Sequence, residues 1–445
     1  MNKIVPQATS GFPEWLPEEK ILEQMFFDII RSNYERFGFV PIETSAVEKK
    51  EVLTAKGGAD KEIYGLSRLS SEETDDTNEL ALHFDLTVPL ARYVVQNYGN
   101  LTFPFRRYQM QKVWRGERPQ SGRFREFYQC DIDVIGDGEL SLMTDAEIPS
   151  IIYQIFKEMG IGRFIININN RKILRGYLQH LGISEENGVL VTRVLDKIEK
   201  IGTQRVVSEL LDMGVSESAA RDLIDFISIS GQNQDVLKTL QEMKINEYFA
   251  KGVEELTKVV ELMGQLGIPD NSFQVNPRIA RGLDYYTGTI YETILADHPG
   301  VGSICSGGRY DDLASFFTDK KLPGVGISIG LTRLLSRLLK AGIVKPSKAT
   351  TASVLITTLD QSYMSKYLEL ATKLRAEKIN TEVFLEPKKI NMQMKYANKK
   401  GFSLAIIAGS NEFEKEELQI KNMMTGEQRT VSKNALIEEV KKELI

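Results

Sequence analysis

The chain has 445 residues, of which 42% are hydrophobic, and a formal net charge of -5. That length exceeds what one hydrophobic core usually organises, so we expect two or three domains with ample core material. A negative net charge gives no overall attraction to phosphate, so contact with nucleic acid would have to come from local basic surface. Composition alone therefore neither indicates nor excludes RNA binding.

Cys130 and Cys305 form no CxxC pair, which argues against a disulfide framework or a cysteine-ligated zinc site and favours a reducing compartment. The first residues contain no apolar signal-peptide core, and no later stretch approaches the roughly 20 apolar residues of a membrane span. We therefore expect a soluble, cytoplasmic protein. The histidines His83, His180 and His298 are scattered, and each is more simply explained as a surface or core residue than as a metal ligand.

The first predicted element is an amphipathic helix that starts at Pro17. Apolar residues from Leu22 to Phe37 recur at the helical period, and Gly38 supplies a C-terminal stop. Phe39 to Ile42 then predicts an apolar strand, whose proline is tolerable only at a sheet edge or bulge. The polar run from Ser70 to Asn78 predicts a loop.

Three strands are predicted next, over Leu80 to Asp85, Phe105 to Trp114 and Phe124 to Ile135. The stretch from Gly116 to Gly122, between the last two, is rich in charge, glycine and proline, which predicts a hairpin with a long charged loop. From residue 171 to 270 the pattern becomes helical and acidic and carries no recognisable chemistry. We interpret residues 171–270 as an inserted helical subdomain.

The strand pattern returns at Thr289 to Ile294 and at Gly326 to Ile329, which runs directly into an amphipathic helix from Leu331 to Leu339. The first domain therefore resumes after the insertion. We expect it to comprise residues 1–170 and 271–340.

Small and polar residues from Gly342 to Thr351 indicate a linker. Beyond it, strands such as Val354 to Ile356 and Leu404 to Ile407 alternate with helical segments such as Met364 to Lys378. This alternation predicts a compact α/β domain over residues 350–445.

The most charged segment is the hairpin from Val113 to Gln129. Its arginines are interleaved with aromatic residues, so they could clamp a nucleotide with guanidinium groups on phosphate and an aromatic face on the base. A solvated, salt-bridged β-ribbon is the simpler explanation of such a pattern taken alone.

Two further segments, Arg281 to Gly288 and Ser306 to Asp311, combine arginine, aspartate and tyrosine with glycine. Glycine lets a ligand approach the backbone, and tyrosine and aspartate can hydrogen-bond a polar ligand. Each segment alone could equally be a turn with a packed tyrosine. The glycines from Gly324 to Gly330 have the spacing GxGxxxG, which is weak evidence for a dinucleotide site.

In this order, the segments resemble the class II histidyl-tRNA synthetase family. Pro41 after the long helix is similar to motif 1, the arginine-rich hairpin to motif 2, and Gly330 to Arg333, opening a helix, to motif 3. Arg281 to Tyr286 and Ser306 to Tyr310 resemble the two histidine motifs of that family. These two motifs are the specific evidence, because motifs 1 to 3 indicate only class II.

The resemblance implies an α+β fold with an antiparallel class II sheet, flanking helices, a helical insertion and a C-terminal α/β anticodon-binding domain. It also implies a homodimer formed through motif 1. The implied activity is the ATP-dependent conversion of L-histidine to histidyl-adenylate, followed by transfer to the 3′ end of tRNA(His). ATP with Mg²⁺ would be the co-substrate, and we expect no prosthetic group and no metal held by the protein alone.

Carried over by position, the resemblance also implies the site residues. The catalytic residues would be Arg115, Arg281 and Arg333. Histidine would be bound by Asp85, Leu86, Thr87, Gln129, Asp133, Tyr285, Tyr286 and Tyr310. ATP would be bound by Arg115, Glu117, Arg123, Phe127, Arg281 and Arg333, and the tRNA acceptor end by Arg118 and Gln120.

A basic stretch of the terminal domain fits an anticodon surface, with phosphate contacts from lysine and base stacking from tyrosine. Its residues are Lys388, Lys389, Lys395, Tyr396, Lys399 and Lys400, with no acid among them. A solvated helix face explains any single lysine equally well.

The sequence departs from the family pattern at two positions. Thr332 stands where motif 3 usually has glutamate, but Arg333 is kept, so we expect activity to survive with altered support around it. His83 stands where the family commonly has arginine, and an ATP contact from that position is therefore not expected.

The strongest rival is a paralogue that binds histidine without charging tRNA, such as the regulatory subunit of ATP phosphoribosyltransferase. Such proteins lack the anticodon domain and tend to lose the ATP arginines, whereas this chain keeps Arg115, Arg333 and residues 350–445. A class II synthetase for another amino acid would leave the tyrosine-rich motifs unexplained. A pure RNA-binding scaffold would be excluded by saturable histidine binding.

Overall fold

The computed structural model describes residues 3–55, 62–68, 79–118, 122–279, 286–311 and 314–444. The chain divides into two compact units, residues 1–13 with 26–344 and residues 14–25 with 345–445. None of the described helices is both long enough and apolar enough to cross a membrane. The loop predicted from Ser70 to Asn78 lies outside the described residues.

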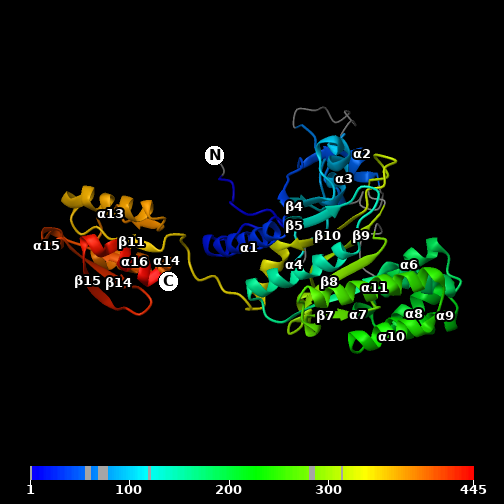
Figure 1. Ribbon diagram of the computed structural model, residues 1–445. Helices are drawn as coiled ribbons and strands as arrows, with labels where there is room; N and C mark the ends of the chain where they lie inside the picture. Colours follow the sequence, from blue (N-terminus) through cyan, green and yellow to red (C-terminus); the bar gives the residue numbers. More distant parts are fainter. Residues whose placement is uncertain are drawn as a thin grey trace. The chain divides into compact units, whose positions relative to one another are not determined.

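The larger unit is built on an eight-stranded sheet with the order β1-β4-β5-β10-β9-β8-β6-β7 (Figure 1). Its strands are β1 (Val40–Pro41), β4 (Phe105–Trp114), β5 (Glu126–Ile135), β6 (Phe164–Asn170), β7 (Phe273–Val275), β8 (Thr289–Leu295), β9 (Ser303–Tyr310) and β10 (Gly324–Gly330). The consecutive strands from β4 to β6 in that order pair antiparallel. This confirms the predicted antiparallel sheet, which β1 and β7 extend by parallel pairing at its edges.

Two helices cover one face of this sheet, α1 (Pro17–Arg36) and α4 (Met143–Met159). The hydroxyl of Tyr34 in α1 donates to the carbonyl of Cys130 in β5 at 2.9 Å. In α4, Asp145 accepts from Arg309 of β9. The first helix thus forms where its period predicts, and it ends before Gly38, whose positive φ of 75° suits a residue without a Cβ.

A small two-stranded sheet, β2 (Val47–Lys49) with β3 (Leu80–Leu82), adjoins α2 (Lys50–Thr54) and α3 (Thr87–Gln96). The prediction of a strand from Leu80 to Asp85 is therefore confirmed as far as Leu82 and wrong beyond it. Asp85 instead lies two residues before α3 and accepts a hydrogen bond at 3.1 Å from the backbone N–H of Val88 in the first turn of that helix.

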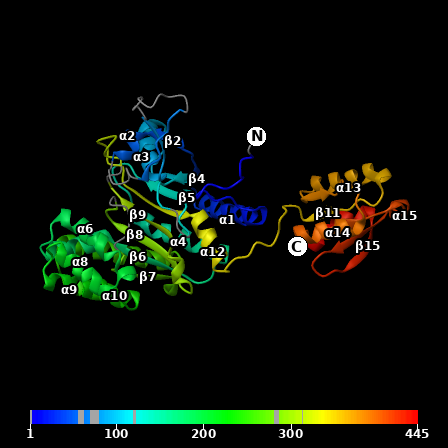
Figure 2. The same ribbon diagram turned by 180° about the vertical axis from the view of Figure 1, so that it is seen from behind.

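The segment predicted to be helical lies at one side of the sheet, where α6, α8, α9 and α10 cluster in both views (Figures 1 and 2). Asn170, Ser184, Ser216 and Asn246 cap its helices with side-chain hydrogen bonds. The helices are α5 (Arg171–His180), α6 (Glu185–Leu195), α7 (Ile198–Ile201), α8 (Thr203–Asp212), α9 (Glu217–Ile227), α10 (Asn233–Met243) and α11 (Glu247–Gln265). The chain then returns to the sheet through β7 and β8, and β10 leads into α12 (Leu331–Lys340).

The smaller unit contains a five-stranded sheet with the order β12-β11-β13-β14-β15. Its strands are β11 (Val354–Ile356), β12 (Thr381–Val383), β13 (Leu404–Ile407), β14 (Glu417–Asn422) and β15 (Gln428–Ser432). Its helices are α13 (Met364–Ala376), α14 (Ile390–Lys400), α15 (Ser410–Glu414) and α16 (Leu436–Leu444).

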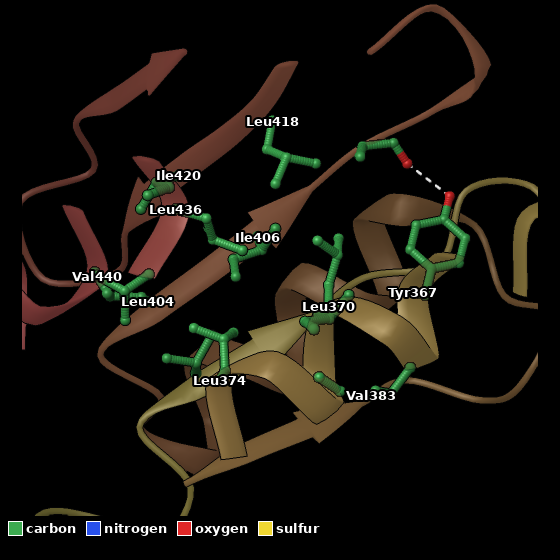
Figure 3. Close-up of a cluster of buried hydrophobic side chains, with 14 of the residues drawn as sticks. Tyr367, Leu370, Leu374, Val383, Leu404, Ile406, Leu418, Ile420, Leu436 and Val440 are labelled. Carbon is green, nitrogen blue, oxygen red and sulfur yellow. Dashed lines mark hydrogen bonds between the residues drawn. The ribbon is translucent and has the colours of Figure 1, made fainter. Parts of the chain in front are cut away.

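The core of this unit is apolar and includes one buried phenol (Figure 3). Leu370 and Leu374 of α13 pack with Leu404 and Ile406 of β13. The hydroxyl of Tyr367 is satisfied inside this core by donating to the carbonyl of Ala408 at 2.6 Å. The residues therefore form the α/β domain that their alternating pattern predicts.

Candidate active site

A cavity of about 290 Å³ lies on the face of the large sheet opposite α1 and α4. This volume is at the lower end of those of ligand pockets, which begin near about 300 Å³. The predicted site residues that line it are Asp85, Thr87, Arg115, Phe127, Gln129, Asp133, Tyr286, Tyr310 and Arg333. The fold thus gathers residues that the sequence scatters from the start of α3 to the start of α12.

The alternation of side chains along β5 places four residues in the lining. Phe127, Gln129, Asp131 and Asp133 occupy every second position and so share one face of the sheet. The intervening residues point to the opposite face, where α1 packs. One strand therefore supplies an aromatic ring, an amide and two carboxylates to the same cavity.

Glycines on β10 make room for this polar group. A Cβ on Gly326 would lie 2.2 Å from Oδ1 of Asp133, and one on Gly324 would lie 2.4 Å from the ring of Tyr310. Both separations are far below contact distance, so larger residues would displace the two side chains. The glycine spacing that faintly suggests a dinucleotide site is explained by this packing.

The segment from Ser306 to Tyr310 is also a strand and not a turn. It forms the second part of β9 and pairs with β8 and β10. A Cβ on Gly307 would lie 2.1 Å from the carbonyl oxygen of Gly326, so the glycine permits close approach of neighbouring backbones. Tyr310, at the end of the strand, consequently points into the cavity.

One end of the cavity is acidic. Arg107 of β4, which is fully buried, lies 2.5 Å from Oδ2 of Asp133, and Tyr310 donates to Oδ1 of Asp133 at 2.9 Å. Burial raises the pKa of Asp133 to about 6, although Arg107 opposes this shift. Burial likewise raises the pKa of Asp131 to about 7. Two carboxyl groups thus share one buried arginine, which favours a ligand that donates hydrogen bonds.

Asp85 contributes a third buried carboxyl group. Its Oδ1 accepts from the backbone of Val88, whereas its Oδ2 has no hydrogen-bond partner within the described part of the chain. Burial raises the pKa of Asp85. A buried carboxylate oxygen without a partner costs free energy, so this atom is suited to a cationic or hydrogen-bonding ligand.

The other end of the cavity is cationic and aromatic. The guanidinium of Arg333 lies 4.0 Å from the ring centroid of Phe127, and that of Arg115 lies 5.2 Å from it. Arg115 is oriented by donating to the carbonyl of Phe84 at 2.9 Å. Burial and the nearby Arg115 lower the pKa of Arg333 to about 10, which keeps it charged at neutral pH. This arrangement suits a purine nucleotide, with phosphate near the cations.

The remaining predicted residues lie around this end. Glu117 faces Arg333 with 3.6 Å between Oε2 and Nη2, while Arg118 and Arg123 are exposed. Leu86 is buried beside Phe127 and Val113, so it supports the cavity and does not line it. The predicted residues Gln120, Arg281 and Tyr285 lie outside the described residues.

Comparison with known proteins identifies the family of the chain. A family model described as histidyl-tRNA synthetase matches residues 11–334. The chain belongs to the histidyl-tRNA synthetase family. A second model, for an anticodon-binding domain, matches residues 353–443.

Relatives in this family match the chain over nearly its whole length. Histidine–tRNA ligase of Clostridium tetani is 48% identical, over 98% of this chain and 98% of that protein. The enzyme of Stenotrophomonas maltophilia is 45% identical, over 99% and 98% of the two chains. A crystal structure of histidyl-tRNA synthetase from Nostoc sp. aligns with a TM-score of 0.92 at 45% identity, over 99% of this chain and 100% of that one.

A more distant likeness concerns fold alone. A Bacillus halodurans protein described as an ATP phosphoribosyltransferase regulatory subunit/histidyl-tRNA synthetase aligns with a TM-score of 0.73 at 20% identity, over 89% of this chain. The class II synthetase fold is thus common to both proteins. The histidyl-tRNA synthetase family assignment rests on the closer relatives.

The two departures from the family pattern have structural explanations. The hydroxyl of Thr332 accepts a hydrogen bond from the backbone of Tyr128 at 2.9 Å and so ties the start of α12 to β5. His83 is buried, its Nε2 lies 2.7 Å from the carbonyl of Lys112, and its ring packs 5.6 Å from that of Trp114. His83 is not in the lining of the cavity, so it is a core residue.

Sequence reasoning missed several residues at the site. Asp131, Ser328 and Arg337 line the cavity, and Arg107 lies beneath it against Asp133. The alternation along β5 could have revealed Asp131, because it lies between two predicted residues on the same strand face. Arg107 could be found only from the register, which places it directly opposite Asp133.

Proposed function

We propose that this protein is a histidine–tRNA ligase, which activates L-histidine with ATP to histidyl-adenylate and transfers the histidyl group to the 3′ end of tRNA(His). The observation that carries the proposal is that one cavity joins an acidic end to a cationic, aromatic end. A histidine substrate offers an ammonium group and ring nitrogens to the first, and ATP offers a base and phosphates to the second. The carboxylate of histidine would then meet the α-phosphate between them.

The acidic end would recognise histidine by its nitrogens. Asp85, with its unpartnered Oδ2, supports binding of the ammonium group together with Thr87 and Gln129. Tyr310 and Asp133, already joined by a hydrogen bond, offer a phenol and a carboxyl group to the imidazole. Tyr285 and Tyr286 are assigned to the same task from the resemblance.

Activation would proceed without a general base, because the substrate carboxylate is already ionised at neutral pH. A carboxylate oxygen attacks the α-phosphorus, the bond to the bridging oxygen breaks, and pyrophosphate leaves. Arg115 and Arg281 would neutralise charge at the α-phosphate. Arg333, whose guanidinium covers the ring of Phe127 at 4.0 Å, would move off that ring to hold the adenine against it. Glu117 and Arg123 would complete the ATP site.

Mg²⁺ fits this proposal as a companion of ATP. Among the described residues no group of three or more His, Cys, Asp or Glu side chains could hold a metal ion alone. Mg²⁺ commonly takes one or two protein carboxylates together with phosphate oxygens and waters. Glu117, whose Oε2 is buried without a hydrogen-bond partner among the described atoms and lies 3.6 Å from Arg333, would supply such a carboxylate at the cationic end. The ion would neutralise phosphate charge.

In the second step, a terminal ribose hydroxyl of tRNA(His) attacks the carbonyl carbon of the adenylate, and AMP leaves. Arg118 and Gln120 would meet the acceptor end of the tRNA. The exposed residues Lys388, Lys389 and Lys395 support an anticodon surface on the smaller unit.

Tyr396 and Lys400 fit that anticodon surface less well than their sequence suggests. The hydroxyl of Tyr396 donates to Glu382 at 2.5 Å, and Lys400 lies 4.0 Å from the same carboxylate. Glu382 of β12 therefore contacts both residues, although the basic stretch that contains them has no acidic residue in the sequence. The exposed Lys399 remains a candidate for phosphate contact.

The proposal extends to the organisation of the chain. Residues 1–170 and 271–340 would form the catalytic domain, residues 171–270 its insertion, and residues 350–445 the anticodon-binding domain. Two copies would associate through motif 1 around Pro41, and the enzyme would work in the cytoplasm.

Histidine-dependent exchange of pyrophosphate into ATP tests the activation step. We expect exchange with histidine alone among the amino acids, and its loss in Arg333→Ala because the adenine loses its cationic cover. The charge-matched control is Arg205→Ala on the exposed surface of α8, which should exchange normally. Histidine binding without exchange would instead identify a regulatory paralogue.

A further inference from the structure

Asp131 lies in the cavity between residues that the synthetase motifs assign, yet none of those motifs assigns a role to it. It is 2% exposed, and its neighbours across the sheet are Gln109 of β4 and Ser328 of β10. A buried carboxyl group needs polar partners. The hydrogen-bond partners of Asp131 therefore indicate its role in the cavity.

Those partners are the carboxamide of Gln129 and the hydroxyl of Ser328. Nε2 of Gln129 lies 3.4 and 3.3 Å from the two oxygens of Asp131 and donates to Oγ of Ser328 at 2.6 Å. At the opposite end of the same amide, Oε1 of Gln129 accepts from Nη2 of Arg115 at 3.4 Å. The amide thus lies between a carboxyl group and a guanidinium.

These two neighbours distinguish the ends of the amide. An ionised carboxylate only accepts hydrogen bonds and a guanidinium only donates them, so the nitrogen must face Asp131 and the oxygen must face Arg115. The reverse orientation would place N–H against N–H and oxygen against oxygen. The carboxamide therefore has one satisfied orientation, which its neighbours set.

We propose that Asp131 is a positioning residue of the histidine site: with Ser328 it holds the carboxamide of Gln129 so that Oε1 is turned to the Arg115 side of the cavity. An amide oxygen has two lone pairs, and Arg115 occupies one. The second accepts from the α-ammonium group of histidine. This inference deepens the proposed function and rests on it.

The test compares steady-state kinetics of histidine-dependent pyrophosphate exchange in the full chain. Asp131→Ala removes the carboxylate that accepts from Nε2 of Gln129. We expect the KM of this variant for histidine to rise about tenfold while kcat changes little, since the charged hydrogen bond that orients the amide is lost. Asp131→Asn keeps one acceptor oxygen but adds an N–H, so it should give an intermediate KM. An unchanged KM in Asp131→Ala, or a loss confined to kcat, would overturn the proposal.

A double-mutant cycle shows whether Asp131 acts through Gln129. If it does, Asp131→Ala added to Gln129→Ala should raise KM no further, because there is no amide left to orient. An undiminished tenfold effect in that background would contradict the proposal. The control is Cys130→Ala, on the same strand but the opposite face. An equal rise of KM in Cys130→Ala would show that general distortion of β5 causes the effect.

The pH profile supplies a readout that a merely structural role would not move. The titratable and charged groups around Asp131 are Arg107 of β4, Asp133 of β5, Cys305 of β9 and Tyr34 of α1. Below a pH of about 7 the carboxyl group of Asp131 gains a proton and can donate, so the orientation of Gln129 is no longer unique. The KM ratio of Asp131→Ala to wild type should therefore fall toward unity from pH 8 to pH 6, and a constant ratio would count against the proposal.

Direct calorimetric titration with histidine separates this inference from the proposed function. If the wild type binds histidine but does not exchange pyrophosphate, the enzymatic proposal fails while the dissociation constants of the variants still test Asp131. If exchange is normal and Asp131→Ala binds histidine as tightly as wild type, only the inference about Asp131 fails.

Discussion

At the scale of single residues, the two buried aspartates of β5 make the site sensitive to pH. Burial raises the pKa of Asp131 to about 7 and that of Asp133 to about 6, with Arg107 opposing both shifts. A carboxyl group with a raised pKa binds its proton more tightly in the folded than in the unfolded chain. Its contribution to stability is therefore complete below about pH 4, near the unfolded pKa of aspartate, and is lost as the pH rises through 6 to 7.

Replacing Asp131 by asparagine should remove much of this dependence. We expect the thermal midpoint of the ligand-free wild type to fall relative to that of Asp131→Asn between pH 5 and pH 8, by a few degrees, since each unit of pKa shift corresponds to about 1.4 kcal/mol. Circular dichroism melts of both proteins across this range measure the difference. Two curves that stay parallel would show that Asp131 titrates normally in the folded chain.

Gln129 and Tyr310 fall within motifs of the family, whereas Asp85 and Asp133 were carried over by position from the resemblance. Asp131 was missed because it is not among the binding positions of those motifs, although β5 alternation places it on the same face. Arg107 differs, because nothing in the sequence distinguishes a buried arginine from the exposed ones nearby. Its role depends on the pairing of β4 with β5, which is a property of the folded chain.

At the scale of elements, the start of α12 is held against β5 by one hydrogen bond. Thr332, which is 2% exposed, accepts from the backbone of Tyr128, the neighbour of Phe127 in the nucleotide end of the cavity. The same helix carries Arg333, whose guanidinium covers that ring. The geometry of the nucleotide end therefore depends on how these two elements are joined.

Thr332→Val should weaken this junction, because it leaves the backbone N–H of half-buried Tyr128 without its acceptor at nearly constant side-chain volume. The loss should cost about 1–3 kcal/mol of stability and raise KM for ATP more than KM for histidine. Unfolding melts and exchange kinetics measure the two effects. Thr332→Ser keeps the hydroxyl and is the control. Identical stability and KM values in both variants would show that the hydrogen bond from Tyr128 to Thr332 contributes to neither.

Elements with strong periodicity, such as α1 and α12, were predicted well because their burial follows their own sequence pattern. β9 was left open as a turn because its glycines resemble those of loops. In the folded chain these glycines allow close strand packing, which only the neighbouring strands reveal.

At the scale of the whole molecule, the order of strands in the large sheet could not be read from the sequence. β10 lies between β5 and β9, so strands far apart in the chain become neighbours. Local patterns predict strands but not such long-range pairing. The resemblance to class II synthetases supplied the antiparallel sheet, and the strand register then explains how the motifs form one cavity.

The most direct test of the account is aminoacylation of purified tRNA(His) by the full chain with ATP, Mg²⁺ and labelled histidine. We expect histidine to become linked to the tRNA by an alkali-labile ester, and periodate-treated tRNA, which lacks the terminal ribose hydroxyls, to accept none. Labelling that requires histidine, ATP and intact tRNA(His) is the result that the account predicts. Histidine-dependent pyrophosphate exchange without any charging of tRNA(His) would contradict the assignment as a histidine–tRNA ligase.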